Sequence, residues 1–149
     1  MEVKFKAVNQ KIGREIPLPQ FATAGSAAMD LHACVDAPVT LKAGERAVIP
    51  TGLAMALPSS GYVALVFARS GLGIKKGVCL SNGVGVIDSD YRGEIAVGLV
   101  NLSAEDYTVQ PGDRIAQLMV VPVVQPTISL VPELDDTDYK RILEVFKKH

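Results

Sequence analysis

At 149 residues the chain fits one domain with a single core, and its net charge of -1 offers no broad positive field to attract a polynucleotide. Its first sixteen residues contain no apolar run long enough for a signal peptide or a membrane span, and two widely spaced cysteines, Cys34 and Cys79, exclude a disulfide scaffold and a CxxC site. We expect a soluble cytoplasmic protein with reduced cysteines, no polynucleotide partner and no membrane contact.

The pattern along the chain predicts short β-strands. Val3, Phe5 and Ala7 alternate with Lys4 and Lys6, which is the period of a half-buried strand. Further apolar or β-branched stretches follow at Leu31/Ala33, Ala47/Ile49, Leu53/Met55, 62–67, Ile95/Val97/Leu99 and 115–121. The turn residues that separate them lie at 43–45, 58–61 and 111–113. Many short strands at near-regular spacing predict an all-β sandwich or jelly roll.

A helical pattern occurs only at the C-terminal end. Tyr139, Ile142, Leu143 and Phe146 fall at i, i+3, i+4 and i+7 behind a candidate cap at 136–138. We therefore divide the chain into a β-domain over residues 1–138 and a C-terminal tail over residues 139–149, which could form a short helix.

Common nucleotide, calcium and zinc motifs do not fit. The glycine-rich stretch 71–77 lacks the spacing and the Lys-Ser/Thr ending of a P-loop. The stretch that starts at Asp88 begins like a calcium-binding loop, but Arg92 and Leu99 occupy its fifth and twelfth positions. His32 lacks the partners that a zinc site or a Ser-His-Asp triad needs, so we interpret it as an ordinary strand residue.

Four polar clusters remain that a β-sandwich does not need for stability. They cover residues 25–30, 68–73, 82–93 and 112–117. Together they supply a cation, hydroxyls, an amide and carboxylates, namely Arg69, Ser26, Ser70, Gln117, Asp30, Asp88 and Asp90. Their glycines let backbone N–H groups approach a ligand closely. Such groups suit a small phosphorylated ligand with a divalent metal.

These clusters resemble the first four motifs of the trimeric dUTPase family, in the same order and at similar spacing. Residues 85–94, GVIDSDYRGE, closely match the third motif, and residues 69–73, RSGLG, match the second. In the first motif Ala28 stands where glycine is usual, while Asp30 keeps its place. The resemblance implies a jelly-roll-like β-sandwich of the dUTPase type. It also implies hydrolysis of dUTP to dUMP and pyrophosphate, which limits uracil incorporation into DNA and supplies dUMP for thymidylate synthesis.

The same resemblance assigns roles to individual residues. Asp88 would hold and activate the attacking water as a general base, and Asp30 would contact Mg²⁺ through water while substrate phosphates hold the metal. The phosphate contacts would be Arg69, Ser70, Gly71 and Gln117. The uracil and deoxyribose pocket would be formed by Asn82, Val86, Ile87, Tyr91 and Ala96. The family also implies a homotrimer with active sites where subunits meet.

The C-terminal tail departs from the family. A segment rich in Arg and Gly, which folds over the nucleotide, usually follows Asp-Thr-Asp, but this chain has no glycine after Gly112. The fifth motif is therefore absent, which implies reduced turnover. An alternative is a non-catalytic or weakly active dUTP-binding or regulatory protein. A dCTP deaminase is a weaker alternative, because Gly98 stands near the position of that enzyme's catalytic Glu.

Overall fold

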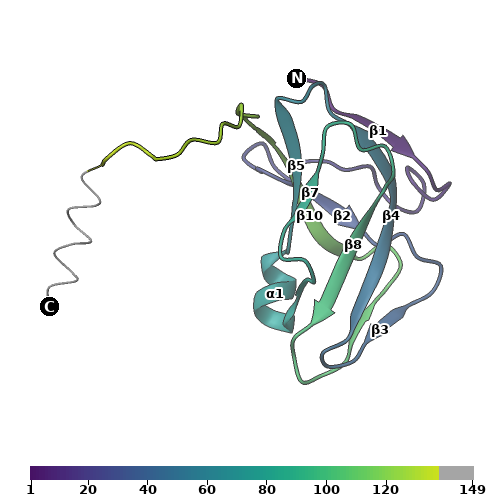
Figure 1. Ribbon diagram of the computed structural model, residues 1–149. Coiled ribbons are helices and arrows are strands. Elements are labelled where there is room, and N and C mark those ends of the chain that lie inside the picture. The colour runs from purple at the N-terminus through teal and green to yellow at the C-terminus, as the bar shows by residue number, and fades with distance from the viewer. Residues whose placement is uncertain (138–149) are drawn as a thin grey trace, which may run out of the picture.

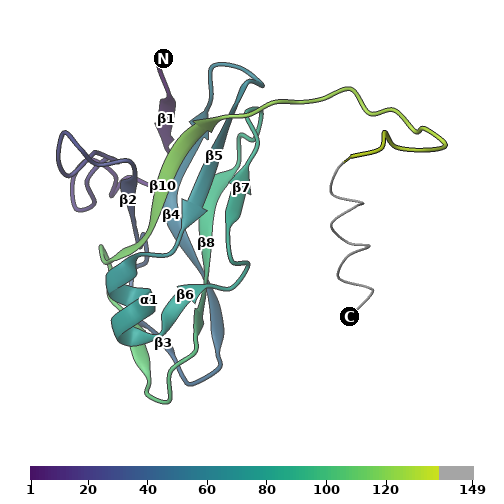
Figure 2. The same ribbon diagram turned by 90° about the vertical axis from the view of Figure 1, so that its left-hand side faces the viewer.

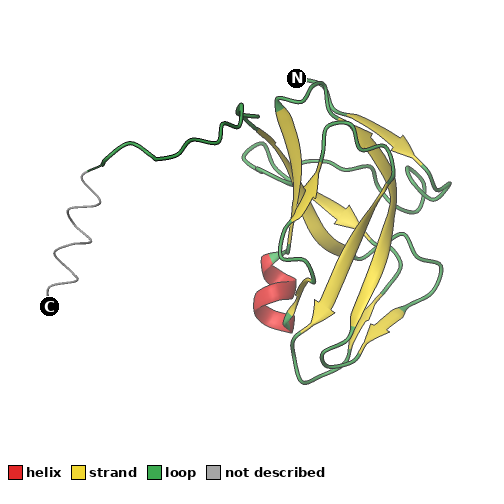
Figure 3. Cartoon of the chain, viewed as in Figure 1, coloured by secondary structure: helices red, strands yellow, loops and turns green. Residues whose placement is uncertain are grey.

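Short antiparallel strands form two four-stranded sheets in the computed structural model, which describes residues 1–137. The first sheet has the order β1 (Lys4–Ala7), β4 (Arg46–Ala56), β8 (Glu94–Asn101) and β6 (Val78–Leu80). The second has the order β2 (Met29–His32), β10 (Arg114–Pro122), β5 (Tyr62–Phe67) and β7 (Gly85–Ile87). A two-stranded ribbon pairs β3 (Val39–Leu41) with β9 (Tyr107–Val109). The strands dominate the cartoon in Figure 3, and the predicted all-β, jelly-roll-like fold is confirmed.

The core lies between the two sheets, which face each other in Figures 1 and 2. Strand β8 shows why its sequence folds this way, because Ile95, Val97 and Leu99 are buried while Ala96 and Gly98 face outward. The largest fully buried apolar side chains are Leu31, Leu41, Ile49, Leu99, Ile115 and Leu118. The apolar stretches that the sequence predicts as strands therefore contribute to strands of the two sheets. Their apolar residues build one core.

A bulge interrupts the pairing of β4 with β8. The register shifts between Pro50 and Ala54, and Gly52 adopts a positive φ of 71°. A side chain at this position would come within 2.8 Å of the Cys34 sulfur, so glycine is required by both conformation and space. The Thr51 hydroxyl donates a buried hydrogen bond to the Ile95 carbonyl at 2.6 Å, which ties the two strands together beside the bulge.

One helix was not predicted. Helix α1 (Ser70–Lys76) follows β5 directly, so the prediction of a helical pattern only at the C-terminus is wrong. The pattern was missed because α1 buries none of its residues and has no apolar stripe, and its Ile74 is 84% exposed. It ends at Gly77, whose left-handed backbone lets its N–H donate to the Leu72 carbonyl.

After β10 the chain leaves the sandwich, as Figures 1 and 2 both show. The Val123 N–H donates to the Gly61 carbonyl at 2.9 Å, and the residues from there to 137 are exposed. The predicted C-terminal helix and the boundary at residue 138 lie outside the described residues. The described part of the chain includes no helix that is long and apolar enough to span a membrane.

Candidate functional site

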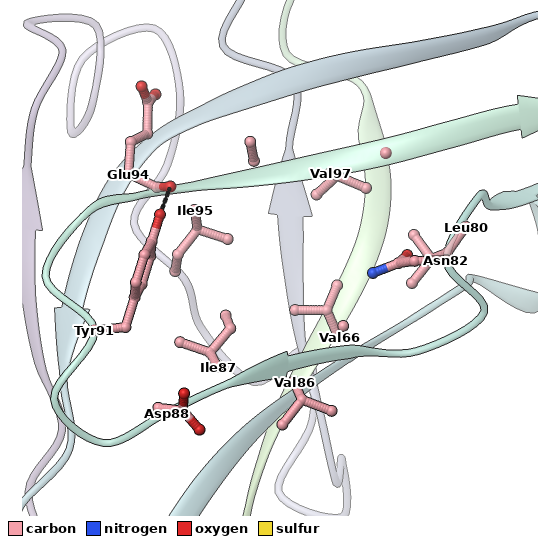
Figure 4. Close-up of a pocket in the computed structure, with 13 residues that line it drawn as sticks. Val66, Leu80, Asn82, Val86, Ile87, Asp88, Tyr91, Glu94, Ile95 and Val97 are labelled. Atoms are coloured by element: carbon pink, nitrogen blue, oxygen red, sulfur yellow. Dashed lines mark hydrogen bonds between the residues drawn. The ribbon is translucent and has the colours of Figure 1, made fainter.

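A cavity of about 260 Å³ opens between β7 with its following turn and the start of β8 (Figure 4). Its lining includes all the predicted base and sugar contacts and the predicted general base, namely Asn82, Val86, Ile87, Tyr91, Ala96 and Asp88. Val66, Leu80, Ile95 and Val97 supply buried apolar side chains. An apolar floor under a polar rim can hold a flat ring while backbone and side-chain polar groups reach its edge.

Glycine brings β7 close to β5. Gly85 pairs with Val66, and a side chain on Gly85 would come within 3.1 Å of the Val66 Cβ atom. The turn that follows closes with a hydrogen bond from the Tyr91 N–H to the Asp88 carbonyl at 3.2 Å. Gly85, Val86 and Ile87 all line the cavity, and β7 is the edge strand of its sheet, so among the described residues one backbone edge of the hairpin is not paired with another strand. We call this cavity the hairpin pocket.

Asp88 lies at the rim of the hairpin pocket and is exposed. Within residues 1–137 its carboxylate makes no ion pair or side-chain hydrogen bond. The neighbouring Arg92 instead donates to the carbonyls of Ser89 and Tyr91 at 2.8 and 3.1 Å, which braces the turn. The carboxylate is therefore free to accept a proton from a water molecule.

The predicted phosphate contacts form a second group around Asp30. Arg69 Nε donates to one carboxylate oxygen of Asp30 at 2.8 Å, and Arg114 Nη1 donates to the other at 3.3 Å. Gln117, which pairs with Asp30 across β10 and β2, donates from Nε2 to the Ala68 carbonyl at 2.8 Å. Two guanidinium groups against one carboxylate leave a net positive charge that suits a phosphate.

Ser70 and Gly71 begin α1 beside this group and are exposed. Burial lowers the pKa of the nearby His32 below its ordinary value; Asp30 opposes this effect, while Arg114 and Arg69 add to it. The imidazole is therefore biased toward its neutral form at pH 7. Sequence reasoning did not assign a role to Arg114, although its position in the 112–117 cluster was the available signal.

The second group lies against a separate hollow of about 480 Å³. Its lining residues are Ala22, Ser26, Ala27, Ala28, Asp30, Phe67, Gln117 and Met119, none of which lines the hairpin pocket. Val66 lines one cavity and Phe67 the other, and consecutive strand residues point to opposite faces of a sheet. Within one chain the hairpin pocket therefore lies on one face of β5, whereas Asp30 and Gln117, with Arg69 bonded to Asp30, lie on the other.

The described residues contain no group of three or more His, Cys, Asp or Glu side chains that could hold a metal ion. Both oxygens of Asp30 accept hydrogen bonds from arginines, although an ionised carboxylate has further lone pairs that can accept from water. This arrangement fits a metal held mainly by ligand phosphates with an indirect contact from Asp30.

Comparisons with known proteins agree with these features. The dUTPase family model matches residues 14–142. The chain is 50% identical over 137 residues to the deoxyuridine 5'-triphosphate nucleotidohydrolase of Idiomarina loihiensis, covering 92% of this chain and 91% of that protein. It is 49% identical over 132 residues to the Hahella chejuensis protein of the same name, covering 89% of this chain and 87% of that protein.

Solved structures show the same fold. A mutant dUTPase from phage phi11 of S. aureus, described with a structural Mg(II) ion, has a TM-score of 0.79 and 23% sequence identity, and the match covers 91% of this chain and 100% of that chain. A mutant dUTPase of Staphylococcus bacteriophage 80alpha, described with dUpNHpp, has a TM-score of 0.79 and 24% identity, with 91% of each chain covered.

Proposed function

The chain belongs to the dUTPase family, and we propose that it hydrolyses dUTP to dUMP and pyrophosphate in the cytoplasm. This reaction would limit uracil incorporation into DNA and supply dUMP for thymidylate synthesis. The observation that carries the proposal is the hairpin pocket, which combines an apolar floor with the carboxylate of Asp88 at its rim, and this carboxylate makes no ion pair within residues 1–137. The two curated relatives described above carry the name of this activity over nearly their whole length.

The hairpin pocket would take uracil at its backbone wall. Val86 and Ile87 present consecutive main-chain groups there, Asn82 adds an amide, and Ala96 leaves room on the opposite strand. Cytosine exchanges the donor and acceptor pattern of uracil at two ring positions, so it would leave buried polar groups unpaired. Such mismatches support discrimination of roughly 10⁴-fold. Tyr91 would pack beneath the deoxyribose and exclude a 2′-hydroxyl.

Asp88 would supply general-base catalysis, worth about 10²–10⁴-fold in rate. Its carboxylate accepts a proton from water as the water oxygen forms a bond to the α-phosphorus. The bond from that phosphorus to the bridging oxygen of the β-phosphate breaks, and pyrophosphate leaves with the bonding electrons. The absence of a competing cation on Asp88 within the described residues supports this role.

Arg69, Ser70, Gly71 and Gln117 would bind the phosphates, with Arg69 oriented by Asp30. We propose Mg²⁺ as the cofactor, held mainly by the substrate phosphates and reached by Asp30 through water. The ion would offset the phosphate charge and stabilise the leaving pyrophosphate. The described residues support this arrangement, since among residues 1–137 Asp30 belongs to no group of three or more His, Cys, Asp or Glu side chains that could hold a metal ion.

We further propose a homotrimer with active sites at subunit interfaces. One nucleotide must contact the hairpin pocket and the Arg69 group together, yet in one chain these lie on opposite faces of β5. Association of identical chains would place the pocket of one subunit against the Arg69 group of another. Residues 139–149 would form an atypical tail in place of the lid motif, and the lack of glycine in this tail would lower turnover relative to enzymes with a complete lid.

Release of pyrophosphate from dUTP tests the proposal, with dCTP, dTTP and UTP as controls and Mg²⁺ present. We expect release from dUTP alone. Binding of dUTP without pyrophosphate release would favour the non-catalytic alternative, and loss of ammonia from dCTP would favour a deaminase.

A further inference from the structure

The side chain of Tyr91 stands at the hairpin pocket without a packed core around it. It is 45% exposed, and an exposed aromatic ring can change rotamer at little cost. A ring that changes rotamer freely cannot exclude a single hydroxyl group from the sugar position. Residues outside the predicted site must therefore hold this ring in place.

Two features fix the hydroxyl end of the ring. The Tyr91 hydroxyl donates a hydrogen bond to the Glu94 carbonyl at 3.0 Å, drawn as the dashed line in Figure 4. The ring also lies directly against Gly93, where a Cβ atom would be 2.5 Å from the hydroxyl oxygen and 2.7 Å from Cζ. Gly93 does not have a positive φ, so the need for glycine there is spatial.

The side chain of Glu94 is hydrogen-bonded to the bulge of β4. Its carboxylate points away from the hairpin pocket in Figure 4 and accepts a hydrogen bond from the Gly52 N–H at 2.8 Å. Because of the bulge, the Gly52 N–H is not part of the regular β4–β8 ladder. The carbonyl of the same residue accepts a hydrogen bond from the Val8 N–H at 2.9 Å. Glu94 thus joins the ring of Tyr91 to a buried strand.

We propose that Gly93 and Glu94 are positioning residues that set discrimination between deoxyribonucleotides and ribonucleotides, by holding the Tyr91 ring against the start of β8. Gly93 leaves the space that the ring occupies, while Glu94 anchors the carbonyl that receives its hydrogen bond. This inference rests on the proposed function, in which Tyr91 contacts the sugar.

The geometry defines the effect of substitution. Gly93→Ala puts a carbon 2.7 Å from the Tyr91 Cζ atom, whereas non-bonded carbon atoms prefer about 3.5–4.0 Å. The clash falls on the far end of a side chain, so the ring can move by about 1 Å while the protein still folds. A displacement of that size at a binding site can cost about 10²-fold in rate.

The test compares kcat/KM for UTP and dUTP in the full chain. We expect Gly93→Ala and Glu94→Leu to raise the UTP-to-dUTP ratio about tenfold or more, because the displaced ring no longer excludes the 2′-hydroxyl. Glu94→Gln keeps an acceptor for the Gly52 N–H and should stay within about twofold of the natural chain. Matched controls are Gly61→Ala, where the new carbon makes only an ordinary contact of 3.4 Å, and Glu45→Leu, which removes a carboxylate bond to the Lys42 N–H. Both controls should keep the natural ratio.

Unchanged ratios in folded Gly93→Ala and Glu94→Leu proteins, or an equal rise in the controls, would overturn the inference. If Gly93→Ala does not fold, Tyr91→Phe removes only the donated hydrogen bond and should still raise the ratio. If the natural chain does not hydrolyse dUTP, calorimetric titration with dUMP and UMP gives the same comparison through affinities. Absence of dUTP hydrolysis would then contradict the proposed function, whereas unchanged affinity ratios for dUMP and UMP in the variants would contradict the proposed positioning of the Tyr91 ring.

Discussion

Two individually inactive variants should restore activity to each other when their chains assemble together. Asp88→Asn removes the proposed base from the hairpin pocket, and Arg69→Gln removes a proposed phosphate contact on the other face of β5. If each active site takes Asp88 from one subunit and Arg69 from another, a mixed oligomer contains some sites with both residues intact.

The expected magnitude follows from how the chains assort. An intact site must take Asp88 from an Arg69→Gln chain and Arg69 from an Asp88→Asn chain. In a random assembly of equal amounts each condition is met in half of the cases, so about one quarter of the sites are restored. Loss of the general base alone costs about 10²-fold or more. The mixture should therefore show about 25% of the natural activity, against about 1% for Asp88→Asn alone.

The assay measures pyrophosphate release after the two variants are unfolded together in urea and refolded, with the natural chain refolded in parallel as the reference. Light scattering reports whether the mass is three times the 15.8 kDa of one chain. Activity equal to the mean of the two separately refolded variants would refute sites shared between subunits, and so would full activity in a monomer.

Three further outcomes are expected. Asp88→Asn should remove hydrolysis while sparing affinity for a non-hydrolysable dUTP analogue in calorimetric titration, because the amide keeps the shape but cannot accept the proton; loss of both would make Asp88 structural. Tyr91→Ala should raise the UTP-to-dUTP ratio of kcat/KM more than it weakens dUTP binding, because it opens space for the 2′-hydroxyl; an unchanged ratio would remove its role at the sugar. Burial lowers the pKa of His32, so as pH falls the unfolded chain binds a proton at this residue before the folded chain does. The free energy of unfolding should therefore decline below about pH 6.5 and level off below the folded-state pKa. Urea unfolding at several pH values should show a smaller decline for His32→Gln, and an identical decline would assign the effect to other groups.

Long strands could be predicted from the sequence because their apolar period is strong. The alternation of Ile95, Val97 and Leu99 in β8 is an example. The strands β3, β6, β7 and β9 have three residues each, which is too few to show a period. Helix α1 could not be predicted for a related reason, because a helix without buried residues has no apolar stripe.

The sequence pointed to residues that share one cavity or one side-chain group, but not to the contacts between them. Family motifs pointed to Asp30, Asp88 and Tyr91, yet residue types alone do not show that Asp30 accepts from Arg69 and Arg114 at once. The contacts that restrain Tyr91 likewise depend on the bulge of β4, which brings a backbone N–H to the Glu94 side chain. Such links join residues far apart in sequence, and only the packed sheets bring them together.

We expect residues 139–149 to differ from the lid motif of the family, and this expectation can be tested by asking whether the tail contributes to turnover. A lid that wraps phosphates with backbone N–H groups needs conformations that glycine supplies readily, and the tail has no glycine. Lys140 and Arg141 could contribute charge but not that backbone cradle. Truncation after Asp138 should therefore lower kcat by less than about tenfold, which corresponds to ~1.4 kcal/mol of transition-state stabilisation. Paired replacement of Lys140 and Arg141 by Ala in the full chain is the matched control for charge. A larger loss on truncation that the paired replacement reproduces would identify the tail as a working lid that acts through its cations, and would refute the expectation of low turnover.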